Sequence, residues 1–169
     1  MTMPDDVAVA VSRLPDLVTL DAFTIAGPSR RFDDGNKAEI PQLWSQLMGK
    51  LPLDGQAADW ASYGLVWNVD RGEGSFDYLA GVGVAEGAVL PAGFAAKHVA
   101  AATYAVFRIT LNGGAVHPQI KRAMATIWGE LVPASGLIVA DAPDFERYDS
   151  EFAPTRKGAV IDFYLPVEM

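Results

Sequence analysis

Two segments of the chain carry the same apolar pattern at helical spacing. The apolar positions of the first segment are Ile40, Leu43, Trp44, Leu47, Met48 and Leu51. The second segment repeats this spacing 80 residues later, with Ile120, Ala123, Met124, Ile127, Trp128 and Leu131. Steps of three and four residues place the six side chains of each set on one stripe of an amphipathic helix. An apolar stretch precedes each stripe and an Asp-aromatic pair follows it, so the pattern predicts one β-α-β-β unit present twice.

The repeat predicts an α+β fold. A helix with a single apolar stripe buries only that side, so we expect both helices to pack on one face of a shared antiparallel sheet. The two units span about residues 17–84 and 102–167. We expect them to be related by pseudo-two-fold symmetry, with Trp44 and Trp128 at equivalent helix positions and a ligand cleft at the junction. With 169 residues, half of them hydrophobic, the chain suits one domain over residues 17–169 after an N-terminal extension, residues 1–16.

Turn residues and alternation set the expected boundaries of the elements. Helices are expected over residues 40–49 and 115–131. Pro41 must lie in the first turn of its helix, because a proline deeper inside would clash with the preceding carbonyl. A polar turn is expected at 30–35 and a connection between the units at 85–101. Strands are expected over residues 17–27, 62–69, 75–84, 102–111, 144–149 and 159–167.

Composition excludes several classes of protein. The net charge of −8 and the scattered basic pairs argue against direct binding of nucleic acid, which needs a concentrated basic surface. The chain has no cysteine, and therefore no disulfide and no thiolate zinc site. His98 and His117 are too isolated for a metal site, and Gly81 and Gly83 lack the third glycine of a dinucleotide fingerprint. We therefore expect neither a metal nor another cofactor.

The N-terminal segment has none of the features of a targeting sequence. Residues 1–17 contain no basic region and no long apolar run, so they do not form a secretory signal. No segment of the sequence approaches the length of a transmembrane helix. We therefore expect a cytoplasmic protein without a membrane partner.

One carboxylate lies in a segment otherwise rich in aromatic residues. Alternation along a strand places Glu146 with Tyr148 on one face, and Phe145 with Arg147 on the other. The carboxylate has two interpretations, and the pattern alone leaves both open. Glu146 is either an exposed edge residue paired with Arg147 or another cation, or a partly buried anion in an aromatic cage that suits an organic cation.

Aromatic residues on other strands and helices complete the candidate site. The same alternation places Tyr63, Leu65 and Trp67 on one face of their strand, and it directs Phe163 and Tyr164 to opposite faces. Trp44 and Trp128 belong to the helical stripes, where core packing is the usual role, but Trp128 borders its stripe and can form a pocket wall. The candidate ligand-binding residues are Glu146, Tyr148, Tyr63, Trp67, Tyr104, Trp128, Tyr78 and Phe163.

The chain resembles the GyrI-like small-molecule-binding family, also known as the effector-binding domain of AraC-type and MerR-type drug-responsive regulators. The resemblance covers about residues 17–167, and the order and spacing of its short segments carry it. These segments are Phe23-Thr24-Ile25-Ala26-Gly27, Ile40-Pro41-Gln42-Leu43-Trp44, Tyr63-Gly64, Phe76-Asp77-Tyr78-Leu79-Ala80-Gly81, Ala102-Thr103-Tyr104-Ala105-Val106-Phe107, Ile127-Trp128 and Asp144-Phe145-Glu146-Arg147-Tyr148. The resemblance implies a duplicated fold of the SHS2 type, with Glu146 in the ligand cleft.

The resemblance leaves two function classes open. The first is a binding module that captures hydrophobic or cationic small molecules for sensing, sequestration or resistance. The second is a hydrolase that opens cyclopropane-bearing electrophilic natural products, with Glu146 as the catalytic residue acting on water. Only about sixteen residues precede the first matched strand, so we expect this copy to act without a helix-turn-helix module. Inhibition of a partner protein such as DNA gyrase follows from the family name, but no residue supports it.

Overall fold

The computed structural model describes residues 10–153 and 157–168. Nine residues of the expected N-terminal extension, 1–9, lie outside this part of the chain. The helical segments are η2 (Lys37–Glu39), α1 (Ile40–Met48), α2 (Val116–Thr126), a π-helical turn η3 (Ile127–Leu131) and α3 (Val132–Ser135). The strands are β1 (Ala10–Val11), β2 (Asp16–Leu20), β3 (Phe23–Phe32), β4 (Ser62–Asp70), β5 (Ser75–Val84), β6 (Phe94–Val99), β7 (Ala102–Thr110), β8 (Ile138–Val139), β9 (Asp144–Tyr148) and β10 (Val160–Glu168).

The strands form one antiparallel sheet whose order reflects the repeat. The order is β1-β7-β10-β9-β4-β5-β3-β6, with β2 also paired to β7 and β8 to β10. Outward from the central pair β9–β4, the second, third and first strands of one unit mirror those of the other: β9-β10-β7 on one side and β4-β5-β3 on the other. This order agrees with a duplicated β-α-β-β unit. The superposition of the two units and the equivalence of Trp44 and Trp128 stay predictions.

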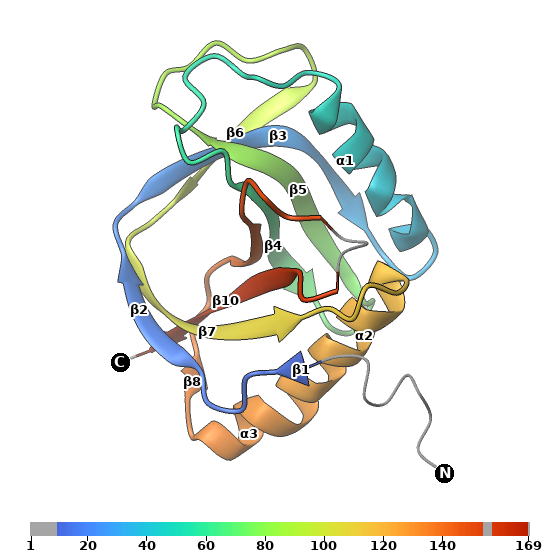
Figure 1. Cartoon of the computed structure of the whole chain (residues 1–169). Helices are drawn as coiled ribbons and strands as arrows, with labels where there is room; N and C mark the ends of the chain where they lie inside the picture. The colour runs from blue at the N-terminus through green and yellow to red at the C-terminus, as the bar shows by residue number, and fades with distance from the viewer. Residues whose placement is uncertain (1–9, 154–156, 169) are drawn as a thin grey trace.

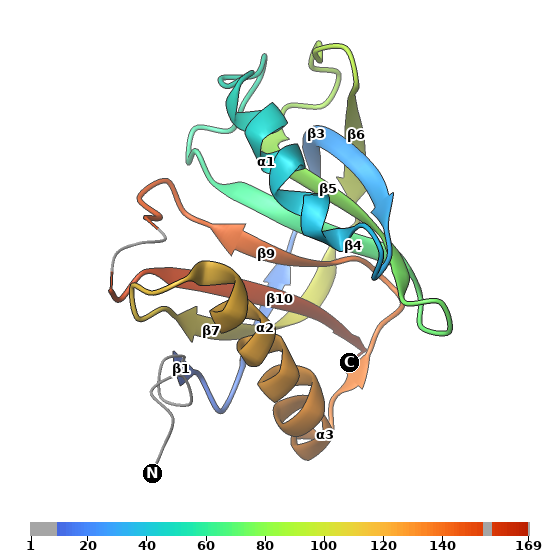
Figure 2. The ribbon, with the colours of Figure 1, turned by 90° about the vertical axis from the view of Figure 1, so that its right-hand side faces the viewer.

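Both main helices cover the same face of the sheet, as predicted (Figure 2). The strand register demonstrates this, because residues that are paired across neighbouring strands point to one side. One row of paired residues runs from β5 to β10 through Ala80, Gly64, Glu146 and Phe163. Ala80 packs in the cluster under α1, and Phe163 packs in the cluster under α2. The two helices therefore share the face to which Glu146 points.

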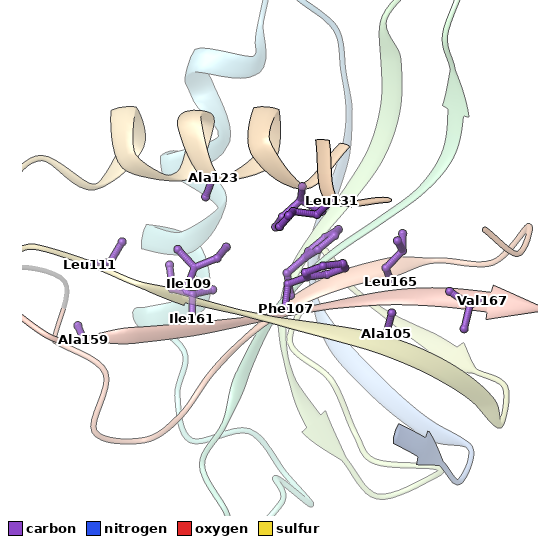
Figure 3. Close-up of a cluster of buried hydrophobic side chains, with 12 residues drawn as sticks. Ala105, Phe107, Ile109, Leu111, Ala123, Leu131, Ala159, Ile161, Leu165 and Val167 are labelled. Carbon is purple, nitrogen blue, oxygen red and sulfur yellow. The ribbon is translucent and has the colours of Figure 1, made fainter. Parts of the chain in front are cut away.

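The second helix buries its apolar stripe on β7 and β10. Ala123, Ile127 and Leu131 are buried against Phe107 and other apolar side chains of these two strands (Figure 3). The three helical residues belong to the stripe that predicted the helix. The helix begins at Val116, one residue after the predicted start, and helical structure continues through η3 and α3 to Ser135. Burial of the stripe therefore accounts for the position of the helix on the sheet.

Two expected segments differ from the structure. Residues 17–27 do not form one strand: β2 ends at Leu20, and β3 begins at Phe23 and continues to Phe32, into the first half of the polar turn expected at 30–35. Residues 85–101 are not only a connection, because they contain β6, which pairs with β3. The register is unbroken across the interruption, since Leu20 faces Ala102 and Phe23 faces Val99. The sheet therefore curls so that β2–β3 and β6–β7 run together as one long ribbon (Figure 1).

The other face of the curled sheet holds a separate core. Its buried members include Tyr63, Leu65, Tyr104 and Phe145, with Trp67 packed against them. The predicted grouping of Tyr63, Leu65 and Trp67 on one face is confirmed. This face is the side of the sheet opposite to the helices, because Phe145 and Leu65 form the row of paired residues next to Glu146 and Gly64.

Candidate functional site

Glu146 lies on an internal strand, under the two helices. Its neighbours across the sheet are Gly64 on β4 and Phe163 on β10. Gly64 has no side chain, and a Cβ atom at this position would collide with the Tyr78 hydroxyl group and lie 3.5 Å from the Trp44 indole. The absence of a side chain at Gly64 thus allows these two aromatic side chains to reach the middle of the sheet beside Glu146.

Glu146 belongs to a compact group of polar and aromatic side chains. We name it the acidic–aromatic cluster, and it consists of Trp44, Tyr78, Asp144, Glu146 and Tyr148. The Tyr148 hydroxyl donates a hydrogen bond to the Glu146 carboxylate. The Trp44 indole N–H donates to the Tyr78 hydroxyl oxygen at 3.0 Å, and the Trp44 and Tyr148 rings meet edge to face with centroids 5.3 Å apart. Side chains from α1, β5 and β9 therefore meet around one carboxylate.

The environment favours the neutral forms of the two β9 carboxyl groups. Desolvation raises the pKa of Glu146, and the hydrogen bond from Tyr148 opposes that shift only in part. Burial, followed by repulsion from Glu146, raises the pKa of Asp144 to about 7, although Arg71 acts in the opposite direction. Burial and the Glu146 charge also raise the pKa of Tyr78 and of Tyr148, so both hydroxyl groups keep their protons.

The two carboxyl groups have no cationic ion-pair partner in the described part of the chain. The ion pairs there involve other carboxylates. Glu146 and Asp144 are half-buried and keep some exposed surface. A carboxylate that is desolvated, accessible and unpaired favours the approach of a cation, because a cation lowers the free energy of its ionised form.

Trp128 and Arg71 lie at the α2 side of the cluster. Trp128 belongs to the π-helical turn η3, and its ring contacts Phe163 with centroids 6.4 Å apart. The guanidinium of Arg71, from the β4–β5 turn, lies 5.7 Å from the centre of the Trp128 ring, a cation–π distance. Single π-helical turns occur often at functional sites. Arg71 therefore occupies one aromatic face next to the cluster.

The structure brings together five of the eight predicted ligand-binding residues. Glu146, Tyr148 and Tyr78 belong to the cluster, and Trp128 and Phe163 lie on the same face of the sheet. The other three, Tyr63, Trp67 and Tyr104, lie on the opposite face and cannot contact a ligand at Glu146.

Each of these three residues has neighbours of its own on the opposite face. Tyr104 is only 1% exposed and contacts Phe145. Trp67 is covered by Lys97, whose ammonium lies 4.9 Å from its ring centre. Tyr63 packs on Phe23 and Phe145.

The interpretation of Glu146 as an edge residue paired with Arg147 is wrong. Strand β9 lies between β10 and β4 and is therefore internal. Arg147 points to the opposite face of the sheet, where its guanidinium lies 3.3 Å from the Asp59 carboxylate. The alternation predicted for β9, with Glu146 and Tyr148 on one side and Phe145 and Arg147 on the other, is confirmed.

Sequence reasoning missed three residues of the site. Asp144 precedes Glu146 by two positions on the same strand, so alternation was a sufficient signal for it. The helical stripe indicated a core-packing role for Trp44, but it gave no information on the hydrogen bond that the indole N–H donates to Tyr78. The sequence contains no signal for Gly64 apart from its position next to Tyr63. Its importance comes from the register of β4 with β9, which pairs it with Glu146.

A separate cavity of about 450 Å³ lies on the face opposite to the cluster. Its lining residues are Leu20, Asp21, Phe23, Thr24, Ala57, Asp59, Tyr63, Gly83, Val84, Phe145, Arg147 and Tyr164. The cavity and the acidic–aromatic cluster are therefore two distinct features, separated by the sheet.

Comparison with known proteins places this architecture among effector-binding domains. The family of integron-associated effector binding proteins has a sequence model that matches residues 16–167. The transcriptional regulator BrlR of Pseudomonas aeruginosa is 33% identical over 153 residues, which are 89% of this chain and 54% of BrlR. The chain thus spans about half the length of that relative.

Solved structures share the fold. The protein SAV2435, solved bound to tetraphenylphosphonium, superposes with a TM-score of 0.69 at 21% identity, covering 91% of this chain and 93% of SAV2435. An integron cassette protein from the mobile metagenome of Vibrio cholerae superposes with a TM-score of 0.60 at 20% identity, covering 95% of this chain and 99% of that chain.

The fold and these relatives define a GyrI-like, small-molecule effector-binding domain of bacterial regulator type. The chain belongs to the family of integron-associated effector binding proteins. No helix in residues 10–153 or 157–168 has the length and apolar character needed to cross a membrane. Within the same residues, no three His, Cys, Asp or Glu side chains gather closely enough to hold a metal ion.

Proposed function

We propose that this protein captures a hydrophobic organic cation on the helical face of its sheet, with Glu146 as the anionic anchor. The observation that carries the proposal is the Glu146 carboxylate itself. It is desolvated and accessible, it is bounded by aromatic rings, and no Lys or Arg of the described chain forms an ion pair with it. A bound cation would supply the positive partner that the Glu146 carboxylate lacks.

The surrounding rings suit the apolar part of such a ligand. Trp44, Tyr148 and Trp128 are half-buried and keep some exposed surface on the same side as Glu146, whereas Tyr78 is buried. Aromatic faces attract cations most strongly where water is excluded. A delocalised or shielded cation costs less to desolvate than an ammonium ion. Hydrophobic cations should therefore bind better than small hydrophilic ones.

The relatives support the binding of a small molecule, and the chemistry of the site supports a positive charge on that molecule. SAV2435 shares the fold and was solved bound to tetraphenylphosphonium, a hydrophobic cation. The site of this chain pairs a carboxylate with aromatic rings, the combination that such a cation requires. We therefore extend the ligand class, hydrophobic cation, to this chain as part of the proposal.

The hydrolase alternative has no observation in its favour. BrlR is a transcriptional regulator, the matching family is one of effector binding proteins, and neither description includes hydrolysis. Sensing or sequestration by binding is therefore the function proposed here, and transformation of the ligand is not part of it.

Titration with tetraphenylphosphonium tests the proposal. Isothermal titration calorimetry should show one binding site with a dissociation constant in the micromolar range. Quenching of tryptophan fluorescence should follow the same isotherm, because Trp44 and Trp128 adjoin the site. Triphenylphosphine oxide, which is neutral and similar in shape, should bind more weakly. Absence of binding up to millimolar tetraphenylphosphonium, or equal affinity for the neutral compound, would refute the proposal.

A further inference from the structure

Strand β9 presents opposite charges on its two faces. Glu146 points toward the helices, whereas its sequence neighbour Arg147 points into the cavity on the other face. Four aromatic rings, those of Phe23, Tyr63, Phe145 and Tyr164, line this cavity together with Arg147. Its volume of about 450 Å³ lies in the usual range for small-molecule pockets, roughly 300–1,000 Å³.

The cavity combines flat apolar walls with one cationic group. Phe145 is buried and contacts the Tyr63 ring edge to face and the Tyr164 ring in a stack with centroids 4.7 Å apart. The Arg147 side chain keeps about 29% of its surface exposed, so a ligand can reach it. An apolar planar group and an anionic group are therefore accommodated side by side.

The present partner of Arg147 is weakly held. One guanidinium nitrogen lies 3.3 Å from a carboxylate oxygen of Asp59, whose side chain is 51% exposed. Exposed single-contact ion pairs contribute little to stability, because solvent screens them and both side chains lose freedom. A planar guanidinium has five N–H donors and forms stronger, bidentate bonds with a carboxylate that meets it face on. A ligand carboxylate can therefore replace Asp59 at small cost.

Arg147 stays charged in this environment. Burial acts to lower the pKa of Arg147, but the hydrogen bond to Tyr63 and the nearby oxygens of Tyr164 and Asp59 outweigh it and raise the pKa. These groups thus support a permanent positive charge in the cavity.

We propose that this cavity is a second ligand site, which takes an aromatic monocarboxylate. The aromatic ring lies among Phe23, Tyr63 and Tyr164, and the carboxylate binds the Arg147 guanidinium in place of Asp59. Multiply charged anions are disfavoured, because the carboxylates of Asp21 and Asp59 also line the cavity. The site is independent of the cation site, because the sheet separates the two and no side chain belongs to both.

Titration with 2-naphthoate tests the second site, with 2-naphthamide as its neutral counterpart. Isothermal titration calorimetry should show binding of the carboxylate, and the amide should bind about tenfold more weakly, since it forms no charge-assisted bond. Naphthalene-2,6-disulfonate, a dianion, should bind more weakly than naphthoate. The resonance of the Arg147 side-chain N–H in ¹H–¹⁵N spectra should shift as 2-naphthoate is added, and this shift should follow the calorimetric isotherm.

Two substitutions should change the affinity in opposite directions. Arg147→Gln should weaken naphthoate binding about tenfold or more, because it removes the charged donor. Asp59→Asn should strengthen it about threefold or more, because it removes the competing carboxylate. Asparagine keeps the Oδ1 atom that accepts the backbone N–H of Ala61, so the loop retains this bond. Arg30→Gln is the matched control: it breaks an exposed arginine–glutamate pair outside the cavity, and it should change the affinity less than twofold.

The outcomes separate this site from the cation site and from chance binding. Unchanged or weaker naphthoate binding in Asp59→Asn would overturn the proposal, even if Arg147→Gln fails to fold. Equal effects of Arg147→Gln and Arg30→Gln would also overturn it, since they would indicate a nonspecific charge effect. Neither result bears on tetraphenylphosphonium binding, so the two proposals fail independently.

Discussion

Substitution of Glu146 by glutamine isolates the charge of the proposed anchor. Glutamine has nearly the same shape and keeps an oxygen that can accept the hydrogen bond from the Tyr148 hydroxyl. The aromatic neighbours Trp44 and Tyr78 are unchanged. A loss of affinity for a cation, but not for a neutral ligand of the same shape, therefore measures the electrostatic contribution of this one carboxylate.

The size of the loss follows from the geometry of the ligand and the environment of the carboxylate. Phenyl rings keep the phosphorus of tetraphenylphosphonium roughly 6 Å from a contacting carboxylate, so two unit charges interact by about 2.8 kcal/mol at an effective dielectric constant of about 20. Glu146 is half-buried, and solvent screening reduces this attraction to about half at its exposed side. The expected loss of about 1.4–2.8 kcal/mol corresponds to about 10–100-fold in the dissociation constant.

Calorimetric titration at pH 8, which is above the pKa of about 7 of the neighbouring Asp144, measures this loss. Triphenylphosphine oxide should bind Glu146→Gln and the unsubstituted protein within about twofold of each other, since no unit charge is involved. Glu130→Gln is the matched control, because Glu130 is exposed on η3 and the change in net charge is the same. An equal loss in both variants, or an equal loss for the neutral ligand, would refute the assignment of Glu146 as the anchor.

Three further predictions concern pH, the aromatic face and the packing of the sheet. The raised pKa of Asp144 means that its folded form holds its proton to higher pH than the unfolded chain does, so stability present at low pH is lost as the pH rises through about 7. Chemical denaturation should show a loss of about 1 kcal/mol between about pH 6 and 8 that Asp144→Asn removes. Tetraphenylphosphonium affinity should rise over the same range as the Asp144 carboxyl group ionises. Arg71→Ala should raise tetraphenylphosphonium affinity about threefold, because it frees the face of Trp128 and removes a competing cation; calorimetry measures this. Gly27→Ala should destabilise the fold by about 3 kcal/mol in urea denaturation, because a Cβ atom there would collide with the backbone carbonyl of Ala80.

Each of these predictions has an outcome that contradicts it. A stability profile that is flat from pH 6 to 8, or one that Asp144→Asn leaves unchanged, would exclude a raised pKa at this position. Weaker cation binding in Arg71→Ala would mean that Arg71 supports the site and does not compete with the ligand. Gly83→Ala is the control for Gly27→Ala, because its Cβ atom would meet only the Ala57 methyl group at 3.3 Å; equal losses of stability would refute the close-packing argument.

Local patterns in the sequence were sufficient for most of the elements. The six-residue stripes predicted both helices, because a helix that covers a sheet must repeat its apolar residues every three or four positions. Strand β5 was predicted at its observed bounds, Ser75–Val84, since glycines mark the turn before it and the segment after it. Alternation also predicted which side chains of β9 share a face, because this depends only on the pleat of a single strand.

The curl of the sheet could not be read from the sequence. Residues 17–27 are apolar enough to suggest one strand, yet Leu20 pairs with β7 and Phe23 pairs with β6. The chain changes its pairing partner from β7 to β6 between Leu20 and Phe23, and this change depends on strands that are distant in the sequence. Strand β6 was missed for the same reason, because its pairing with β3 gives it its structure and its own sequence lacks strong alternation.

Some residues of the candidate site could be predicted from the sequence, and others only from the tertiary structure. The sequence singled out Glu146 as a candidate, because a carboxylate among aromatic residues of a strand is unusual whatever the fold, and the family resemblance implied its place in the cleft. Only the tertiary structure decided which aromatic rings lie beside it. Alternation defines two faces for each strand, but the register between strands decides which face of one matches which face of the next, and here Gly64, not Tyr63, faces Glu146. A shift of one residue would have brought Tyr63 to the helical face and turned Tyr78 out of reach, so the site depends on long-range pairing that no local pattern encodes.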